Sequence, residues 1–224
     1  GEIFEPVGIF SHAEAVEMFH EQAEGLKDGG VDVLWLETIS SRKEYIAATE
    51  AFAKVELPWC GTMSFDTAGR TMMGITSENM VDLVQTLDHP PVTFGANCGT
   101  GASDLLRALL GFAAKKPTSA LIAKGNAGIP KYVNGHIHYD GTPDLMADYA
   151  VMARNSGAKI IGGCCGTMPE HLKKMRTALE TCAPDQAPSL KKIEEMLDAF
   201  SSASDGTCLS SQVQKRVRRR RRAI

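Results

Sequence analysis

The chain has 224 residues, of which 43% are hydrophobic and 23% charged, and its formal net charge is −3 at pH 7. This composition is ordinary for a soluble globular protein. No apolar run approaches the length of a membrane span, no signal peptide opens the chain, and six cysteines without secretory features do not suggest a disulfide scaffold. We therefore expect a cytoplasmic protein, without membrane contact, whose reduced thiols are available to bind metal.

The basic residues gather at the C-terminal end of the chain. Residues 201–224 hold seven Lys and Arg against Asp205 alone, so residues 1–200 are acidic overall. The arginine run at 218–222 could contact phosphate groups or RNA, but no aromatic residues are interleaved with it and no folded framework surrounds it. We expect 201–224 to be a disordered basic tail and the chain to bind no nucleic acid.

One helix and then five strand–helix units follow along the chain. The first helix is predicted at 11–27, with Ser11 as its cap and Gly29-Gly30 after its end. Strict alternation of strands and helices predicts a parallel sheet covered by helices. Beyond a break at 184–188, a short amphipathic helix is predicted at 189–200. The predicted strands lie at 31–37, 58–64, 92–98, 120–124 and 158–163, and the helices that follow them at 42–54, 77–87, 103–114, 142–155 and 169–179, with Thr167 as the cap of the last.

Residues able to do chemistry collect at the C-terminal ends of these strands. Convergence of this kind is most natural in a (β/α)8 barrel. Five strands do not close such a barrel, so the residues alone leave open an open sheet or a barrel whose other three strands lie upstream. The residues at strand ends are Glu37, Asn97, Cys98, Asn126, Cys164 and Cys165.

Two of these strand ends carry three thiols between glycines. Cys98 ends the strand that runs into Gly99, and Cys164-Cys165 lie in the turn Gly162-Gly163-Cys164-Cys165-Gly166. A buried Cys is more often a packing residue than a ligand. Three thiols at strand ends, with glycines that let a ligand approach, nevertheless favour a tetrahedral zinc site that keeps one position for a substrate.

Other candidate ligands are weaker. Cys60 lies within a strand, where an inert core thiol is expected, and Cys182 and Cys208 fall outside the strand–helix units. His136 and His138 alternate along the chain, but they belong to a long polar loop, so we expect them not to bind metal.

The motifs at 95–98 (Gly-Ala-Asn-Cys) and 162–166 resemble those of the homocysteine S-methyltransferase family, which includes betaine–homocysteine methyltransferases and the homocysteine-binding module of cobalamin-dependent methionine synthase. Glu37-Thr38 and the 125–128 segment (Gly-Asn-Ala-Gly) support the resemblance, which covers about residues 11–182. It implies a zinc-containing (β/α)8 barrel that transfers a methyl group to homocysteine to give methionine. Cys98, Cys164 and Cys165 match the Zn²⁺ ligands and Glu37 the carboxylate that holds the homocysteine amino group, while Asn97 and Asn126 match positions near the substrate pocket.

The N-terminal end of the chain differs from the pattern of this family. The family begins with an Asp-Gly-rich first strand that has no counterpart here, so we expect the first three strand–helix units to be absent. Residues 1–183 would then be the C-terminal part of the barrel, 184–200 a helical extension and 201–224 the tail. A non-catalytic metal-binding or assembly protein is therefore the alternative of another class.

The methyl donor is the least specified feature of the sequence. Members that use betaine enclose its quaternary ammonium with aromatic side chains, whereas cobalamin-dependent relatives dock a methylcorrinoid protein over the barrel. No aromatic residue directly follows Glu37, which mildly disfavours a betaine cage at that strand end. On overall resemblance, betaine stands slightly ahead of the corrinoid partner, and a homo-oligomer stays open.

Overall fold

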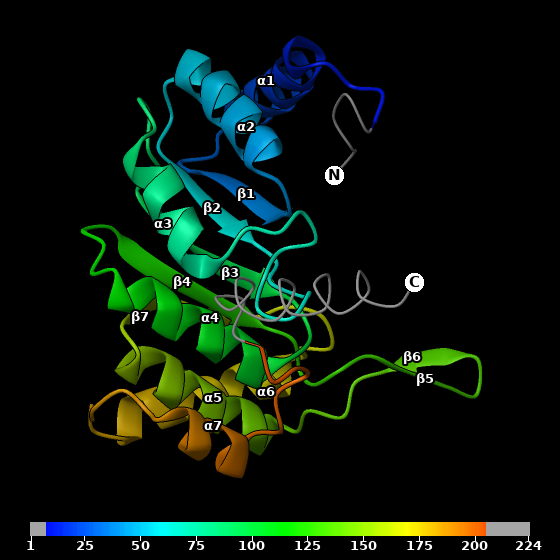
Figure 1. The fold of residues 1–224 in the computed structure, drawn as a ribbon, viewed down its shortest axis with the longest axis vertical. Helices are drawn as coiled ribbons and strands as arrows, with labels where there is room; N and C mark the ends of the chain where they lie inside the picture. The colour runs from blue at the N-terminus through cyan, green and yellow to red at the C-terminus, as the bar shows by residue number, and fades with distance from the viewer. Residues whose placement is uncertain (1–7, 205–224) are drawn as a thin grey trace, which may run out of the picture.

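A parallel sheet of five strands, in the order β1-β2-β3-β4-β7, runs through the centre of the protein (Figure 1). The computed structural model describes residues 8–204. Consecutive strands are neighbours and each is followed by a helix, so the predicted α/β alternation is confirmed as five units of a (β/α)8-type arrangement. The strands are β1 (Leu34–Ile39), β2 (Trp59–Met63), β3 (Thr93–Cys98), β4 (Ala120–Gly125) and β7 (Ala158–Gly163).

Two of the helices begin at side-chain caps that the sequence indicates. Ser11 caps α1 through a capping box with Glu14, and Thr142 accepts from the N–H of Leu145 at the start of α5, where Pro143 is the first residue. These caps satisfy backbone N–H groups that have no partner within the helix. The helices are α1 (His12–Asp28), α2 (Arg42–Val55), α3 (Ser77–Gln85), α4 (Ala102–Ala114), α5 (Pro143–Asn155), α6 (Pro169–Thr181) and α7 (Leu190–Met196).

The two faces of the sheet differ in what covers them. Toward the helices, the ring of Trp59 lies 5.4 Å from that of Phe52 on α2, and Phe94 lies 5.9 Å from Phe112 on α4. The opposite face, which would line the interior of a barrel, is more open: Trp35 is 39% exposed. Because side chains alternate along a strand, every second residue of β1 points to this inner face.

The structure corrects several predicted boundaries. The first strand begins at Leu34 rather than at residue 31, and α6 is capped by Met168 rather than Thr167, with the ring of His171 accepting the Met168 N–H. The predicted polar loop around His136 and His138 contains an antiparallel hairpin of β5 (Lys131–Val133) and β6 (His136–His138), which extends away from the sheet (Figure 1).

The predicted helix at 189–200 is shorter because the chain leaves it to bond with α4. The hydroxyl of Ser103 accepts from the N–H of Asp198 and donates to its carbonyl, at 3.2 and 2.7 Å. Arg107 donates to the Ser202 carbonyl and lies over the ring of Phe200. The segment after α7 is therefore docked on the barrel units, and residues 205–224 of the predicted tail lie outside the described part.

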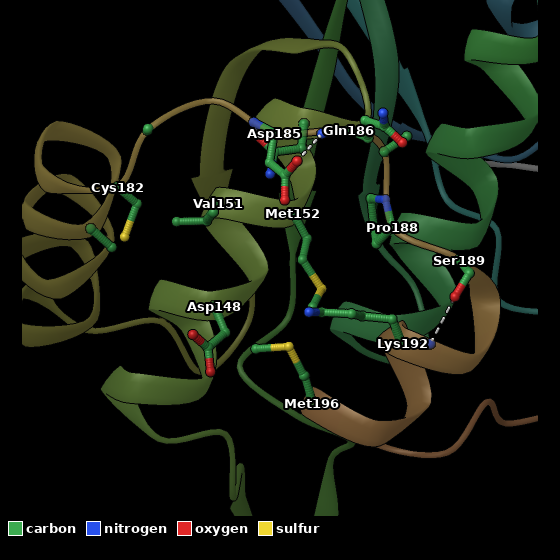
Figure 2. A pocket seen from close by; sticks show the side chains of 14 residues that line it. Asp148, Val151, Met152, Cys182, Asp185, Gln186, Pro188, Ser189, Lys192 and Met196 are labelled. Carbon is green, nitrogen blue, oxygen red and sulfur yellow. Dashed lines mark hydrogen bonds between the residues drawn. The ribbon is translucent and has the colours of Figure 1, made fainter.

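A hollow of about 410 Å³ lies between α5, α6 and the segment leading to α7 (Figure 2). Asp148 and Met152 of α5 face Lys192 and Met196 of α7 across it, and Cys182 lies at its edge. None of the strand-end residues lines this hollow, so it is separate from the candidate site. Within residues 8–204, no helix is both long and apolar enough to cross a membrane.

Candidate metal centre

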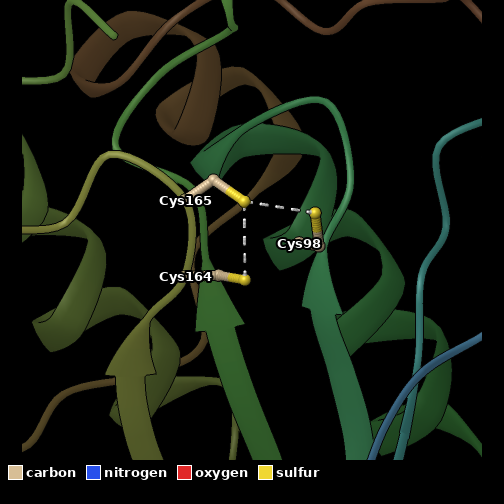
Figure 3. Close-up of side chains that lie close together, drawn as sticks. All are labelled: Cys98, Cys164 and Cys165. Atoms are coloured by element: carbon tan, nitrogen blue, oxygen red, sulfur yellow. Dashed lines mark hydrogen bonds between the residues drawn. The ribbon is translucent and has the colours of Figure 1, made fainter.

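The three thiols predicted as ligands come together at the C-terminal ends of β3 and β7 (Figure 3). The Sγ atom of Cys165 lies 3.9 Å from that of Cys98 and 4.0 Å from that of Cys164. All three sulfur atoms lie within 4.8 Å of one another, and among the described residues they form the one group of three His, Cys, Asp or Glu side chains close enough to share an ion.

These spacings fit a tetrahedral metal. With Zn–S bonds of about 2.3 Å, two sulfur ligands of a tetrahedral zinc lie about 3.8 Å apart. Two of the three sulfur–sulfur separations, 3.9 and 4.0 Å, are close to that distance, so little movement of the side chains is needed to bind an ion. Cys165 is exposed, while Cys98 and Cys164 are half-buried, which leaves one side of the triad open to a fourth ligand.

The backbone holds the thiols in fixed positions. Cys98 has a left-handed conformation, with φ of 59°, at the point where β3 ends, an unusual choice for a residue with a side chain. The N–H of Cys164 donates to the carbonyl of Gly125, and the carbonyl of Cys165 accepts from Ala127. These bonds tie the turn after β7 to the end of β4. A strained residue held by its surroundings is typical of a functional site.

Asn97 connects four strand ends through one buried amide. Its Oδ1 accepts from the N–H of Thr38 and from the hydroxyl of Thr62, at 3.0 and 2.7 Å. Its Nδ2 donates to the hydroxyl of Thr38 at 2.7 Å and points toward the Sγ of Cys164 at 3.8 Å. Asn97 is fully buried, and through these contacts its side chain supports the three thiols.

Asn126 supports the other two cysteines, Cys98 and Cys165, through a second buried amide. Its Nδ2 donates to the Gly99 carbonyl at 2.8 Å and lies 3.7 Å from the Sγ of Cys98, while its Oδ1 accepts the Cys165 N–H at 3.0 Å. This residue is also buried. Each asparagine thus offers an N–H to one sulfur, the kind of contact that orients metal ligands and disperses thiolate charge.

The surroundings of Cys98 favour its protonated thiol in the absence of a metal. Burial, with a smaller effect from the two neighbouring cysteines, raises the pKa of Cys98 to about 11, although the hydrogen bond from Asn126 acts in the opposite direction. Tyr139, whose ring packs against Gly166, has a raised pKa because of burial and a hydrogen bond with Cys165. A metal ion would therefore have to displace the Cys98 proton as it binds.

Glu37 lies on the inner face of β1, where it forms an ion pair with Lys124 of β4. The ammonium group of Lys124 also lies 5.2 Å from the centre of the Trp35 ring. These three side chains line an open cavity of about 490 Å³ together with residues 160–162 of β7. The carboxylate is thus partly exposed in a cavity, as a substrate-binding role requires, but it already has a partner within the protein.

Comparisons with known proteins identify the family. The sequence model described as homocysteine S-methyltransferase matches residues 4–179, most of the chain. The chain belongs to the homocysteine S-methyltransferase family. The resemblance seen in the strand-end motifs is therefore confirmed.

Solved structures of the homocysteine methyltransferase MmuM from Escherichia coli have a similar fold. The apo form is 21% identical, with a TM-score of 0.60 over 79% of this chain and 61% of that chain. The metallated form is 24% identical, with a TM-score of 0.55 over 72% of this chain and 51% of that chain. The oxidized form is 25% identical, with a TM-score of 0.53 over 72% of this chain and 52% of that chain. The chain thus spans less than two thirds of the length of MmuM.

In this member of the homocysteine S-methyltransferase family, the candidate site includes residues that the sequence reasoning missed. Trp35 and Lys124 lie beside Glu37, and Tyr139 lies beside Cys165. Trp35 could have been found by counting in twos along β1, because residues i and i+2 share a face of a strand. The prediction from the sequence took into account only the residue after Glu37, whereas the ring of Trp35 lies two residues before it. No sequence signal brings Tyr139 to the triad, since a hairpin separates it from β4.

Proposed function

We propose that this chain is a zinc-dependent homocysteine S-methyltransferase in which Cys98, Cys164 and Cys165 hold the metal. The observation that carries the proposal is the spacing of the three sulfur atoms, with neighbouring pairs 3.9 and 4.0 Å apart and one side open. Family membership supports the reaction class. The metallated form of MmuM supports a metal in a related protein.

The chemistry needs a nucleophilic sulfur at neutral pH. Bound zinc would supply this, because coordination keeps a thiol deprotonated and three cysteines leave one position for the homocysteine sulfur. Asn97 and Asn126 hold two of the ligand sulfurs in place through their N–H groups. Glu37 would bind the homocysteine ammonium by a charge-assisted hydrogen bond and so orient the sulfur toward the donor.

Betaine is the methyl donor that we favour, with a methylcorrinoid protein as the alternative. The partly exposed ring of Trp35 on the inner face supports betaine, because aromatic faces attract quaternary ammonium groups. The donor test is methionine formation from homocysteine with betaine or with methylcobalamin. Transfer from methylcobalamin alone would overturn the preference for betaine.

The function is tested first by metal and substrate binding. Chain purified without chelator is expected to hold about one zinc per molecule, and substitution with cobalt(II) is expected to give thiolate-to-metal absorption that changes when homocysteine is added. Zinc content well below one per chain would refute the metal site. Zinc binding without any methionine formation would favour the non-catalytic alternative.

A further inference from the structure

The ion pair between Lys124 and Glu37 crosses the inner face of the sheet. Lys124 is on β4 and Glu37 on β1, with β2 and β3 between them, so the two side chains meet over the sheet rather than along one strand. The ammonium lies near the face of Trp35, from the same side of β1 as Glu37. The Lys124 side chain is 24% exposed and that of Glu37 36%, so water reaches the pair.

This pair lies just below the thiols on the same face. Lys124 is aligned with Gly162 of β7 in the sheet register, and Cys164 comes two residues after Gly162. Two strand residues span about 6.6 Å. A Cβ on Gly162 would meet the Lys124 side chain at 3.5 Å, which shows that this side chain faces the same wall. An elongated ligand with its sulfur at the triad would therefore direct its other end toward Lys124 and Glu37.

The chemistry of the pair matches a zwitterion. A carboxylate and an ammonium in contact present one negative and one positive group to the cavity, and an α-amino acid carries the two opposite groups on one carbon. In homocysteine, two methylene groups separate that carbon from the sulfur. Insertion of the ligand would replace one partly exposed ion pair, a weak interaction, by two contacts of opposite polarity.

We propose that Lys124 determines specificity for an α-amino-acid thiol by binding its carboxylate, while Glu37 binds its ammonium. In the free protein, the Lys124 ammonium occupies the place of the ligand ammonium. This inference rests on the proposed function, and it adds a residue that was not among those predicted from the sequence.

Calorimetric titration of the zinc-loaded full chain with three thiols tests the inference. Homocysteine carries both groups, 3-aminopropane-1-thiol lacks the carboxylate, and 4-sulfanylbutanoate lacks the ammonium. Lys124→Met is expected to lower homocysteine affinity about ten- to a hundredfold, the loss of one charge-assisted contact. The same variant should bind 3-aminopropane-1-thiol as well as the wild type or better, because Glu37 is freed.

Controls separate binding from folding. Lys131→Met removes an ammonium that pairs with Asp140 in the exposed hairpin, and it should leave all three affinities unchanged. Lys124→Arg should restore part of the preference for homocysteine. Zinc content reports whether the thiol site is intact in each variant.

The outcomes distinguish the two proposals. Wild-type protein that holds zinc but binds none of the thiols would overturn the proposed function and this inference together. Wild-type binding of homocysteine, with Lys124→Met weakening homocysteine and 3-aminopropane-1-thiol equally, would overturn only the role of Lys124. A selective loss of homocysteine and 4-sulfanylbutanoate would support it.

Discussion

The amide nitrogen of Asn126 lies 3.7 Å from the sulfur of Cys98, while the oxygen of the same side chain accepts the backbone N–H of Cys165 at 3.0 Å. One buried side chain therefore fixes two of the three thiols relative to each other across β3, β4 and β7. Such contacts usually matter nearly as much for metal binding as the ligands themselves.

Asn126→Ala is expected to lower zinc affinity about ten- to a hundredfold, because the thiols lose both their spacing and one N–H donor. Competition with a chromogenic chelator measures this. Asn79→Ala, on the exposed surface of α3, is the matched control and should leave zinc affinity unchanged. Equal zinc affinity in both variants would show that the triad does not depend on Asn126.

Much of the fold could be read from the sequence because local signals agree with the tertiary structure. Ser11 and Thr142 cap helices as expected, and the strand ends at Cys98 and Gly163 carry the turn residues that the fold needs. The clustering of Cys98, Cys164 and Cys165 could be predicted equally well, since the ends of neighbouring parallel strands meet at one edge of a sheet.

What the sequence did not predict depends on contacts between distant segments. The helix at 189–200 ends early because Asp198 bonds to Ser103, almost a hundred residues away in the chain. Lys124 reaches Glu37 only because the sheet curves, and curvature is not visible in hydrophobic periodicity. Asn97 and Asn126 were expected near the substrate pocket. Both are buried, and their amide groups contact the thiols. Their role toward substrate stays a prediction.

The assignment of metal ligands predicts a difference between two cysteines, one directly after β7 and one directly after α6. Cys164→Ser should reduce the zinc content of purified protein sharply, because a hydroxyl is a poor substitute for a thiolate on zinc. Cys182→Ser, at an exposed cysteine after α6, should retain the wild-type content. Metal analysis of the two proteins, purified side by side, would contradict the assignment if both lost zinc equally.

The proposed role of Glu37 predicts that substrate affinity and metal content separate. Glu37→Gln should weaken homocysteine binding by about 1.5–3 kcal/mol, or roughly ten- to a hundredfold, because a neutral amide cannot form the charge-assisted bond to an ammonium. Zinc content should not change, since Glu37 lies on β1 and is not among the clustered thiols. Calorimetry with zinc analysis in parallel measures both.

A control at another exposed carboxylate makes the Glu37 comparison specific. Glu50→Gln removes a carboxylate on α2 that pairs with His12, on the helical side of the protein. It should alter neither homocysteine affinity nor zinc content. If Glu37→Gln lost zinc along with homocysteine, the carboxylate would support the metal or the fold instead of the substrate.

Because the segment after α7 docks on α4, we expect two ion pairs of this helix to contribute differently to the free energy of unfolding. Arg107 and Asp104 are both less than 10% exposed, whereas the pair of Lys115 with Asp82 is exposed to solvent. Removing one partner of a buried pair leaves an uncompensated charge, so Arg107→Ala should cost about 3–5 kcal/mol of unfolding free energy. Lys115→Ala should cost less than about 1 kcal/mol. Urea denaturation of both variants measures the difference.

Limited proteolysis should in addition show faster cleavage after α7 in Arg107→Ala, because Ser202 and Phe200 lose their partner. Similar stability of the two variants would mean that the segment after α7 adds little to the fold.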